Sequence, residues 1–288
     1  MKKLFFLFLG FLCITANAQS ITGKATYQSK TVPDFKMEGE GITDEMRKQI
    51  EENLKRALEK SYTLEFTVDE SLYKEEQVLD VNSGTNPFRV MMVNFSEGVQ
   101  YKNSKENVFL QEQEFFGKQF LITDTLQVLD WQLTNESKQI GQYVAFKATA
   151  IKKLSQMDWR SMRRKNQEED SEKVKDSTET SLLDQLEMPE EIEITAWFTP
   201  QIPVSHGPGE FYGLPGLILE VQSDKTSILC SKIVLNPNEG VKIKKPSKGT
   251  QVTREEFAKI AEDKMKEMQE MYGGRQRGGG NFNIRFGN

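Results

Sequence analysis

The stretch that decides the fold is WFTPQIPVSHGPGEFYGLPGLILEV, from Trp197 to Val221. Its two ends have the composition of strands, and a loop rich in glycine and proline joins them. The loop carries His206, the single histidine of the chain. Gly213 and Gly216 allow a positive φ or a close backbone approach. Pro215 has no N–H to donate to a ladder, so it belongs before the second strand or at a bulge.

Two interpretations of this loop are open. In the first, it is a tight turn that feeds a core strand, in which Leu217, Leu219 and Val221 face one way. In the second, the loop lines the mouth of a ligand site. The candidate binding residues of that site are His206, Tyr212, Gly213, Leu214, Pro215 and Gly216. We favour the first interpretation.

The N-terminus has the pattern of a secretory signal over residues 1–18. Lys2 and Lys3 precede an apolar run, and Ala16-Asn17-Ala18 is a small-residue cleavage site. The run is shorter than the ~20 residues that span a bilayer. We therefore expect an exported, periplasmic protein that is not an integral membrane protein, with a possible association with the outer membrane. Cys13 leaves lipid anchoring as the less favoured alternative to release.

Charge and cysteine content narrow the class of protein. Removal of the two signal lysines takes the formal net charge from −5 to −7. An acidic chain has no general attraction for nucleic acid or anionic lipid. Cleavage would leave Cys230 as the single thiol, so no internal disulfide can form. The remaining 270 residues are enough to build a stable core without one.

Short stretches of period-two hydrophobicity dominate the rest of the chain. They predict strands in antiparallel hairpins, because no helical segments alternate with them. Phe88–Phe95 and Leu126–Leu133 are two of these predicted strands. The predicted fold is mainly β (α+β), a curved antiparallel sheet or half-barrel. A helix from Thr43 accompanies it, and a C-terminal helix opens with the capping box Thr253-Arg254-Glu255-Glu256 and runs to about Tyr272. We expect one domain over residues 19–272, with a charged insertion at 157–191, and a flexible Gly/Arg-rich tail at 273–288.

The run Gly213-Leu214-Pro215-Gly216-Leu217-Ile218 resembles, letter for letter, the motif of the GLPGLI family of bacterial proteins. The approach through Trp197-Phe198-Thr199 is also similar, as are Trp131 and Phe146-Lys147-Ala148. One departure is Ala145, where similar proteins often carry a cysteine. The resemblance implies an exported protein of Gram-negative bacteria, and it supplies no catalytic residues.

Three groups of side chains are candidates for chemistry. His206 suits acid–base catalysis, but it lacks a nucleophile motif or further ligands, which favours a structural role. Cys230, in the middle of a predicted strand, is expected in the core. Met265, Met268 and Met271 form a thioether series that suits Cu(I), although the same positions continue an apolar helix face.

The function predicted from the sequence is a non-enzymatic periplasmic binding or cell-envelope accessory protein without a cofactor. In one version a lipid or peptide occupies the concave sheet. Its partners would be outer-membrane or other envelope proteins. Two alternatives stay open: a copper-handling protein that uses the methionine helix, and a hydrolase that uses carboxylates or His206.

Overall fold

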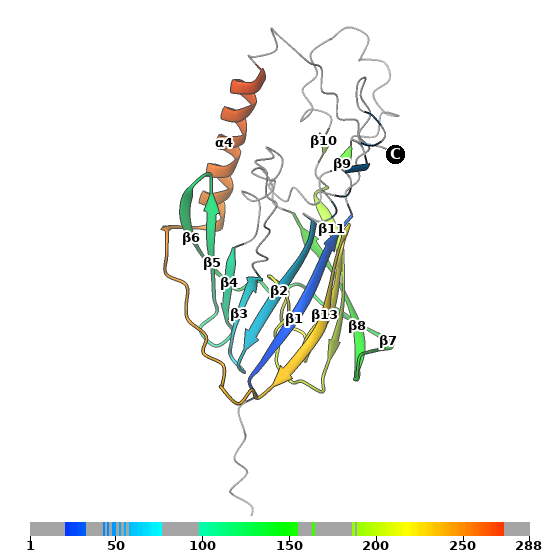
Figure 1. Ribbon diagram of the computed structural model, residues 1–288. Coiled ribbons are helices and arrows are strands. Elements are labelled where there is room, and N and C mark those ends of the chain that lie inside the picture. Colours follow the sequence, from blue (N-terminus) through cyan, green and yellow to red (C-terminus); the bar gives the residue numbers. More distant parts are fainter. Residues whose placement is uncertain are drawn as a thin grey trace, which may run out of the picture.

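A long antiparallel sheet organises the chain (Figure 1). The computed structural model describes residues 21–32, 58–76, 98–154, 163–164, 186–187 and 189–273, with residues 43, 45, 48, 49, 52 and 55. The strands and the helix are β1 (Gly23–Thr31), β2 (Glu59–Phe66), β3 (Glu70–Glu75), β4 (Val99–Asn103), β5 (Val108–Phe115), β6 (Lys118–Thr125), β7 (Gln132–Ile140), β8 (Tyr143–Lys153), β9 (Arg163–Arg164), β10 (Leu186–Glu187), β11 (Glu191–Thr199), β12 (Leu217–Ser223), β13 (Thr226–Leu235), β14 (Thr250–Val252) and α4 (Arg254–Gly273).

Twelve strands form the main sheet in the order β14-β6-β5-β4-β3-β2-β1-β13-β12-β11-β8-β7. Neighbouring strands are antiparallel except β14, which runs parallel to β6. The first half is a meander from β1 to β6, and β13 joins it to the second half by pairing with β1. The sheet curves but does not close, because β7 and β14 lie at opposite ends of the order. The predicted mainly-β, curved antiparallel fold is confirmed.

The main core lies on the concave face, and the β3–β6 half also buries apolar side chains on its convex face. Around β1 the concave face carries the main core, with Ala25, Tyr27, Leu64 and Phe66 packed against residues of β11 and β12. In the β3–β6 half, a smaller cluster of Leu72, Tyr101 and Leu110 lies on the convex face. Ile243, in the segment between β13 and β14, covers it. The concave face of β4 instead carries buried polar side chains, Lys102 among them.

Local signals fix several boundaries. Thr253 accepts from the Glu256 amide at 3.1 Å and its own amide donates to the Glu256 carboxylate at 2.8 Å, which is the predicted capping box of α4. Ser223 pairs with Thr226, and Asp224 has a φ of 48°, as a two-residue hairpin turn requires. Residues 45, 48, 49, 52, 55 and 58 are helical, in agreement with the helix predicted from Thr43.

Some sequence predictions are wrong in part, and others concern residues that the structure does not describe. A strand predicted over 126–133 is wrong for 126–131, which are irregular; β7 begins at Gln132. The predicted strand Phe88–Phe95, the signal over 1–18 and the tail over 274–288 lie outside the described residues. So does most of the insertion 157–191, in which β9 pairs with β10. The described part of the chain has no helix long and apolar enough to cross a membrane.

Gly216 offers a test of how tightly the second half is packed. A Cβ atom there would lie 2.2 Å from the carbonyl oxygen of Thr199, a backbone atom that cannot rotate away. We expect Gly216→Ala to lower the free energy of unfolding by about 3 kcal/mol or more, measured by urea denaturation.

The matched control is Gly141→Ala. Gly141 also has a positive φ, 59°, but open space surrounds the position of its Cβ. The free energy of unfolding of this variant should fall by about 1 kcal/mol, the cost of the left-handed backbone alone. Equal losses for the two variants would contradict a steric role for Gly216.

Candidate functional site

The loop between β11 and β12, residues 200–216, crosses the concave face of the sheet. Its inward side chains are buried: Ile202, Val204, His206, Phe211, Tyr212 and Leu214. Just after the loop, at the start of β12, the Ile218 carbonyl accepts from the Tyr27 hydroxyl of β1 at 2.7 Å. It also reaches the segment before β7, where the Trp131 indole donates to the Tyr212 carbonyl at 2.9 Å. This loop therefore acts as an internal brace across the sheet.

Small residues let the loop lie this deep. A Cβ on Gly207 would come within 2.7 Å of the Ile218 side chain and 2.8 Å of the Phe211 carbonyl oxygen. Gly213 adopts a φ of 95°, which side chains rarely tolerate. The glycine and proline content noted in the sequence thus has a steric explanation.

Lys102 of β4 fixes the loop from the opposite half of the sheet. Its Nζ donates to three backbone carbonyls, at 2.9 Å to Gly207, 2.6 Å to Gly209 and 3.2 Å to Phe211. The side chain is 1 % exposed. Burial lowers the pKa of Lys102 to about 7, an effect that the Glu210 carboxylate opposes. Three carbonyl acceptors match the three N–H donors of an ammonium group, so these hydrogen bonds hold the loop and offset part of the cost of burying the charge.

His206 lies in the same buried region. Its Nε2 is 3.2 Å from the Val68 carbonyl, in the turn between β2 and β3. Its Nδ1 is buried without a hydrogen-bond partner in the described structure, as is the Ser71 hydroxyl, whose residue pairs with Lys102. Burial, and then the nearby charge of Lys102, lower the pKa of His206 to about 4. The imidazole is therefore neutral at pH 7.

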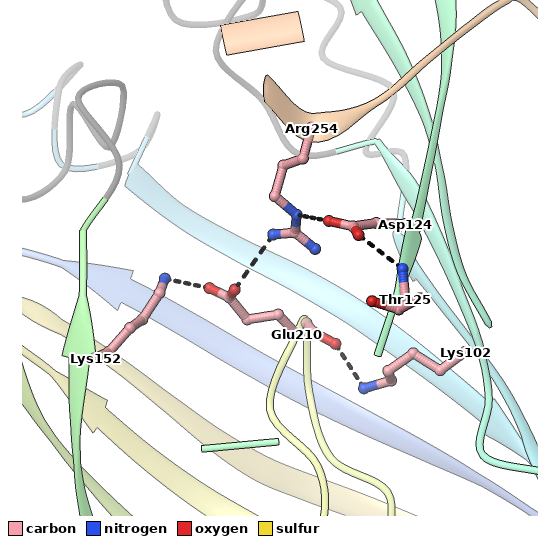
Figure 2. A network of polar contacts seen from close by, with 7 residues as sticks. Lys102, Asp124, Thr125, Lys152, Glu210 and Arg254 are labelled. Carbon is pink, nitrogen blue, oxygen red and sulfur yellow. Dashed lines mark hydrogen bonds and ion pairs between the residues drawn. The ribbon is translucent and has the colours of Figure 1, made fainter. Parts of the chain in front are cut away.

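A chain of ion pairs lies beside this region and links distant strands (Figure 2). The Glu210 carboxylate of the loop pairs with Lys152 of β8 and lies 3.7 Å from Nη1 of Arg254, at the start of α4. The Arg254 Nε lies 3.0 Å from Asp124 of β6. The network thus joins β8, near one end of the sheet order, to β6, near the other. We refer to Lys152, Glu210, Arg254 and Asp124 as the ionic clasp.

The predicted motif residues divide by exposure. His206, Tyr212, Leu214 and Gly216 are buried, whereas Gly213 and Pro215 are exposed. These residues lie together because they are close in the sequence, but the side chains of the buried ones face the protein interior. That these residues line the mouth of a ligand site remains a prediction. Met265, Met268 and Met271 lie in α4, and their side chains are outside the described part.

The remaining candidates are placed as follows. Cys230 is half-buried, and burial raises the pKa of its thiol to about 12. Trp131 and Trp197 are partly buried and pack against the main core. Among the described residues, no three His, Cys, Asp or Glu side chains are grouped as a metal site would require.

Sequence reasoning missed Lys102 and the ionic clasp. Lys102 sits in Val99–Asn103, VQYKN, where a lysine in a short strand gives no sign of burial. Its carbonyl partners lie about a hundred positions later, the most distant 109 residues away. Local patterns carry no information on such a pairing.

Comparison with known proteins gives a family match and similar solved structures. Residues 131–220, from before β7 into β12, match the model of a protein family of unknown function (Porph_ging). No curated protein matches the chain. A solved structure of PNGF-II aligns with 83 % of this chain and 32 % of its own, at 14 % identity and a TM-score of 0.45; a second crystal form gives 0.43. The chain thus spans about a third of the length of PNGF-II.

The family match covers the brace and strands β7, β8 and β11, but not β4, whose Lys102 holds the brace. It fits a family without an assigned function. The name GLPGLI, taken from the motif, stays a resemblance.

The role of Lys102 in holding the brace can be tested by Lys102→Met, which keeps the length of the side chain and removes its hydrogen-bond donors. Three buried carbonyls would lose their partner, so we expect the free energy of unfolding to fall by about 3 kcal/mol. Thermal and urea unfolding measure the loss. Lys153→Met is the control, because Lys153 is exposed on β8, and it should change stability by less than ~0.5 kcal/mol. A stable Lys102→Met variant would contradict the role assigned to Lys102.

Acid should weaken the fold through His206. Its pKa in the folded protein, about 4, lies below the ordinary 6.5, so the unfolded chain takes up the proton first as pH falls. Stability is therefore lost between pH 6.5 and 4, by roughly 3 kcal/mol from this group. We expect the melting temperature of His206→Gln to depend less on pH across this window. Parallel curves for the two proteins would contradict the prediction.

Proposed function

We propose that the protein is a non-enzymatic, exported binding or accessory protein of the cell envelope. Its most reactive groups are committed to internal structure, and this observation carries the proposal. The Lys102 donors are used by the brace, His206 is neutral and buried, and the Cys230 thiol stays protonated because its pKa is raised to about 12. Internal networks also perturb pKa values, so these shifts are compatible with a structural role for the three groups.

Binding then falls to the surface, and the β7 edge is the best-supported place. Leu133, Val144 and Phe146 expose 61 %, 46 % and 39 % of their surface. Leu133 is opposite Ala148 in the ladder, and Ala148, Phe146 and Val144 alternate along β8. The three exposed side chains therefore share one face of the sheet beside its edge. We call them the edge patch.

The occupant that suits this edge is an extended peptide segment of an envelope protein. In the described part of the chain, β7 pairs with β8 on one side and no strand pairs on the other. An added strand would hydrogen-bond to residues 137–140, beyond the register shift that follows Leu133. The shift and Lys138 protect the edge against indiscriminate pairing, and the edge patch would favour a segment with apolar side chains.

The test is site-specific photo-crosslinking in the producing cells. A crosslinker at Gln139, on the edge strand, should capture a discrete partner. We expect Leu133→Ser with Phe146→Ser to reduce the yield at least about tenfold, since the pair removes two contacts of about 1 kcal/mol each.

The matched control replaces Leu229 and Val234 on β13, which are 45 % and 38 % exposed, by serine. It should leave the crosslink intact. Capture that survives the edge-patch variant, or that both variants abolish equally, would contradict the proposed function. Melting temperatures confirm that both variants are folded.

A further inference from the structure

A charged surface lies on the opposite, convex side of the β3–β6 half. The segment from Asn236 to Gly249 connects β13 to β14 and runs along the outside of the sheet (orange in Figure 1). Lys242, Lys244, Lys245 and Lys248 fall within seven of its residues, and all four are exposed. With Glu239, residues 239–248 carry a formal charge of +3 on a chain whose net charge is −5. We call this segment the lysine strap.

The strap is held in place along its length. At its start, the Asn236 amide donates to the Thr22 carbonyl at 2.8 Å. In its middle, Ile243 packs on the cluster of Leu72, Tyr101 and Leu110, and Pro246 is buried. At its end, the Ser247 and Lys248 amides donate to one Glu112 carboxylate oxygen at 2.9 and 3.0 Å. The lysines therefore project from a fixed backbone.

The anchoring separates the lysines by role. Lys245 lies 3.6 Å from Glu106 and 5.9 Å from the centre of the Tyr101 ring, so it helps to hold the strap. Lys242 and Lys244 flank Ile243, which packs inward, and both lysines are exposed. No ion pair is recorded for Lys242, Lys244 or Lys248 within the described residues. Their ammonium groups are available to an outside anion.

From this geometry we propose that the lysine strap docks the protein on a lipid surface that carries phosphate groups. The inference deepens the proposed function by naming a partner surface in the envelope. Lysine is depleted at protein–protein interfaces, and the apolar side chains of the strap point inward, so no apolar centre is left for a protein partner. Several outward lysines on one rigid segment instead suit a charged plane, where each contributes about fivefold to binding.

The experiment is sedimentation with vesicles, using protein purified as the exporting cell processes it. The probe is phosphatidylcholine containing about one third phosphatidylglycerol, compared with phosphatidylcholine alone. We expect binding to the anionic vesicles only, and its loss in about 0.5 M NaCl. Lys242→Gln, Lys244→Gln and Lys248→Gln together should weaken binding on the order of 100-fold. Lys245 is kept, so the strap stays attached.

The control variant makes the same change of charge elsewhere, with Lys153, Lys232 and Lys259, all exposed, replaced by glutamine. It should bind vesicles within about threefold of the parent protein. Equal losses in the two triple variants, or no binding to anionic vesicles at all, would overturn the proposal. Preference for a polyaspartate peptide over the vesicles would also overturn it, in favour of an acidic protein partner.

The two proposals fail separately. The edge-patch variant, Leu133→Ser with Phe146→Ser, should keep full vesicle binding. The strap variant should keep its crosslink at Gln139 in cells where the partner is present at the same level.

Discussion

The structure depends on the hydrogen-bonded burial of one ammonium group. A lysine out of water is costly unless all its donors are satisfied. Three backbone carbonyls of the brace satisfy Lys102. The contact is between β4 and the β11–β12 loop, which belong to different halves of the sheet. In a closed barrel, hydrogen bonds between the two edge strands hold the sheet together. This sheet is open, and the contact between Lys102 and the brace links its two halves instead.

The ionic clasp complements this tie at the margin of the sheet. Lys152 and Asp124 come from β8 and β6, and Glu210 and Arg254 connect them. These side chains are partly exposed, so salt screens their attraction and each pair contributes little alone. Their value lies in position: Arg254 opens α4 while Phe257, one turn later, packs on Phe115 and Phe120. The helix, the brace and both sheet halves meet there.

The sequence was a good guide to whatever is local. Period-two patterns predicted most of the strands, and the capping box Thr253–Glu256 predicted the start of α4. The glycines of the brace predicted a close approach of the backbone. It was a poor guide to the buried polar contacts, because Lys102 and Glu210 look like ordinary surface residues in their own neighbourhoods. It also could not show that the β3–β6 half buries apolar side chains on both of its faces, since alternation does not reveal what will cover each face.

The pairing of β1 with β13 has a consequence for the time at which the sheet can form. Tyr27 is opposite Cys230, so the central ladder joins residues about two hundred positions apart. A polypeptide that is delivered from its N-terminus would present β1 and β2 long before their last neighbour is available. Closing so large a loop slows acquisition of structure and leaves strand edges open meanwhile. Such a chain would gain from a holding chaperone that covers the open edge of β1 until β13 is available.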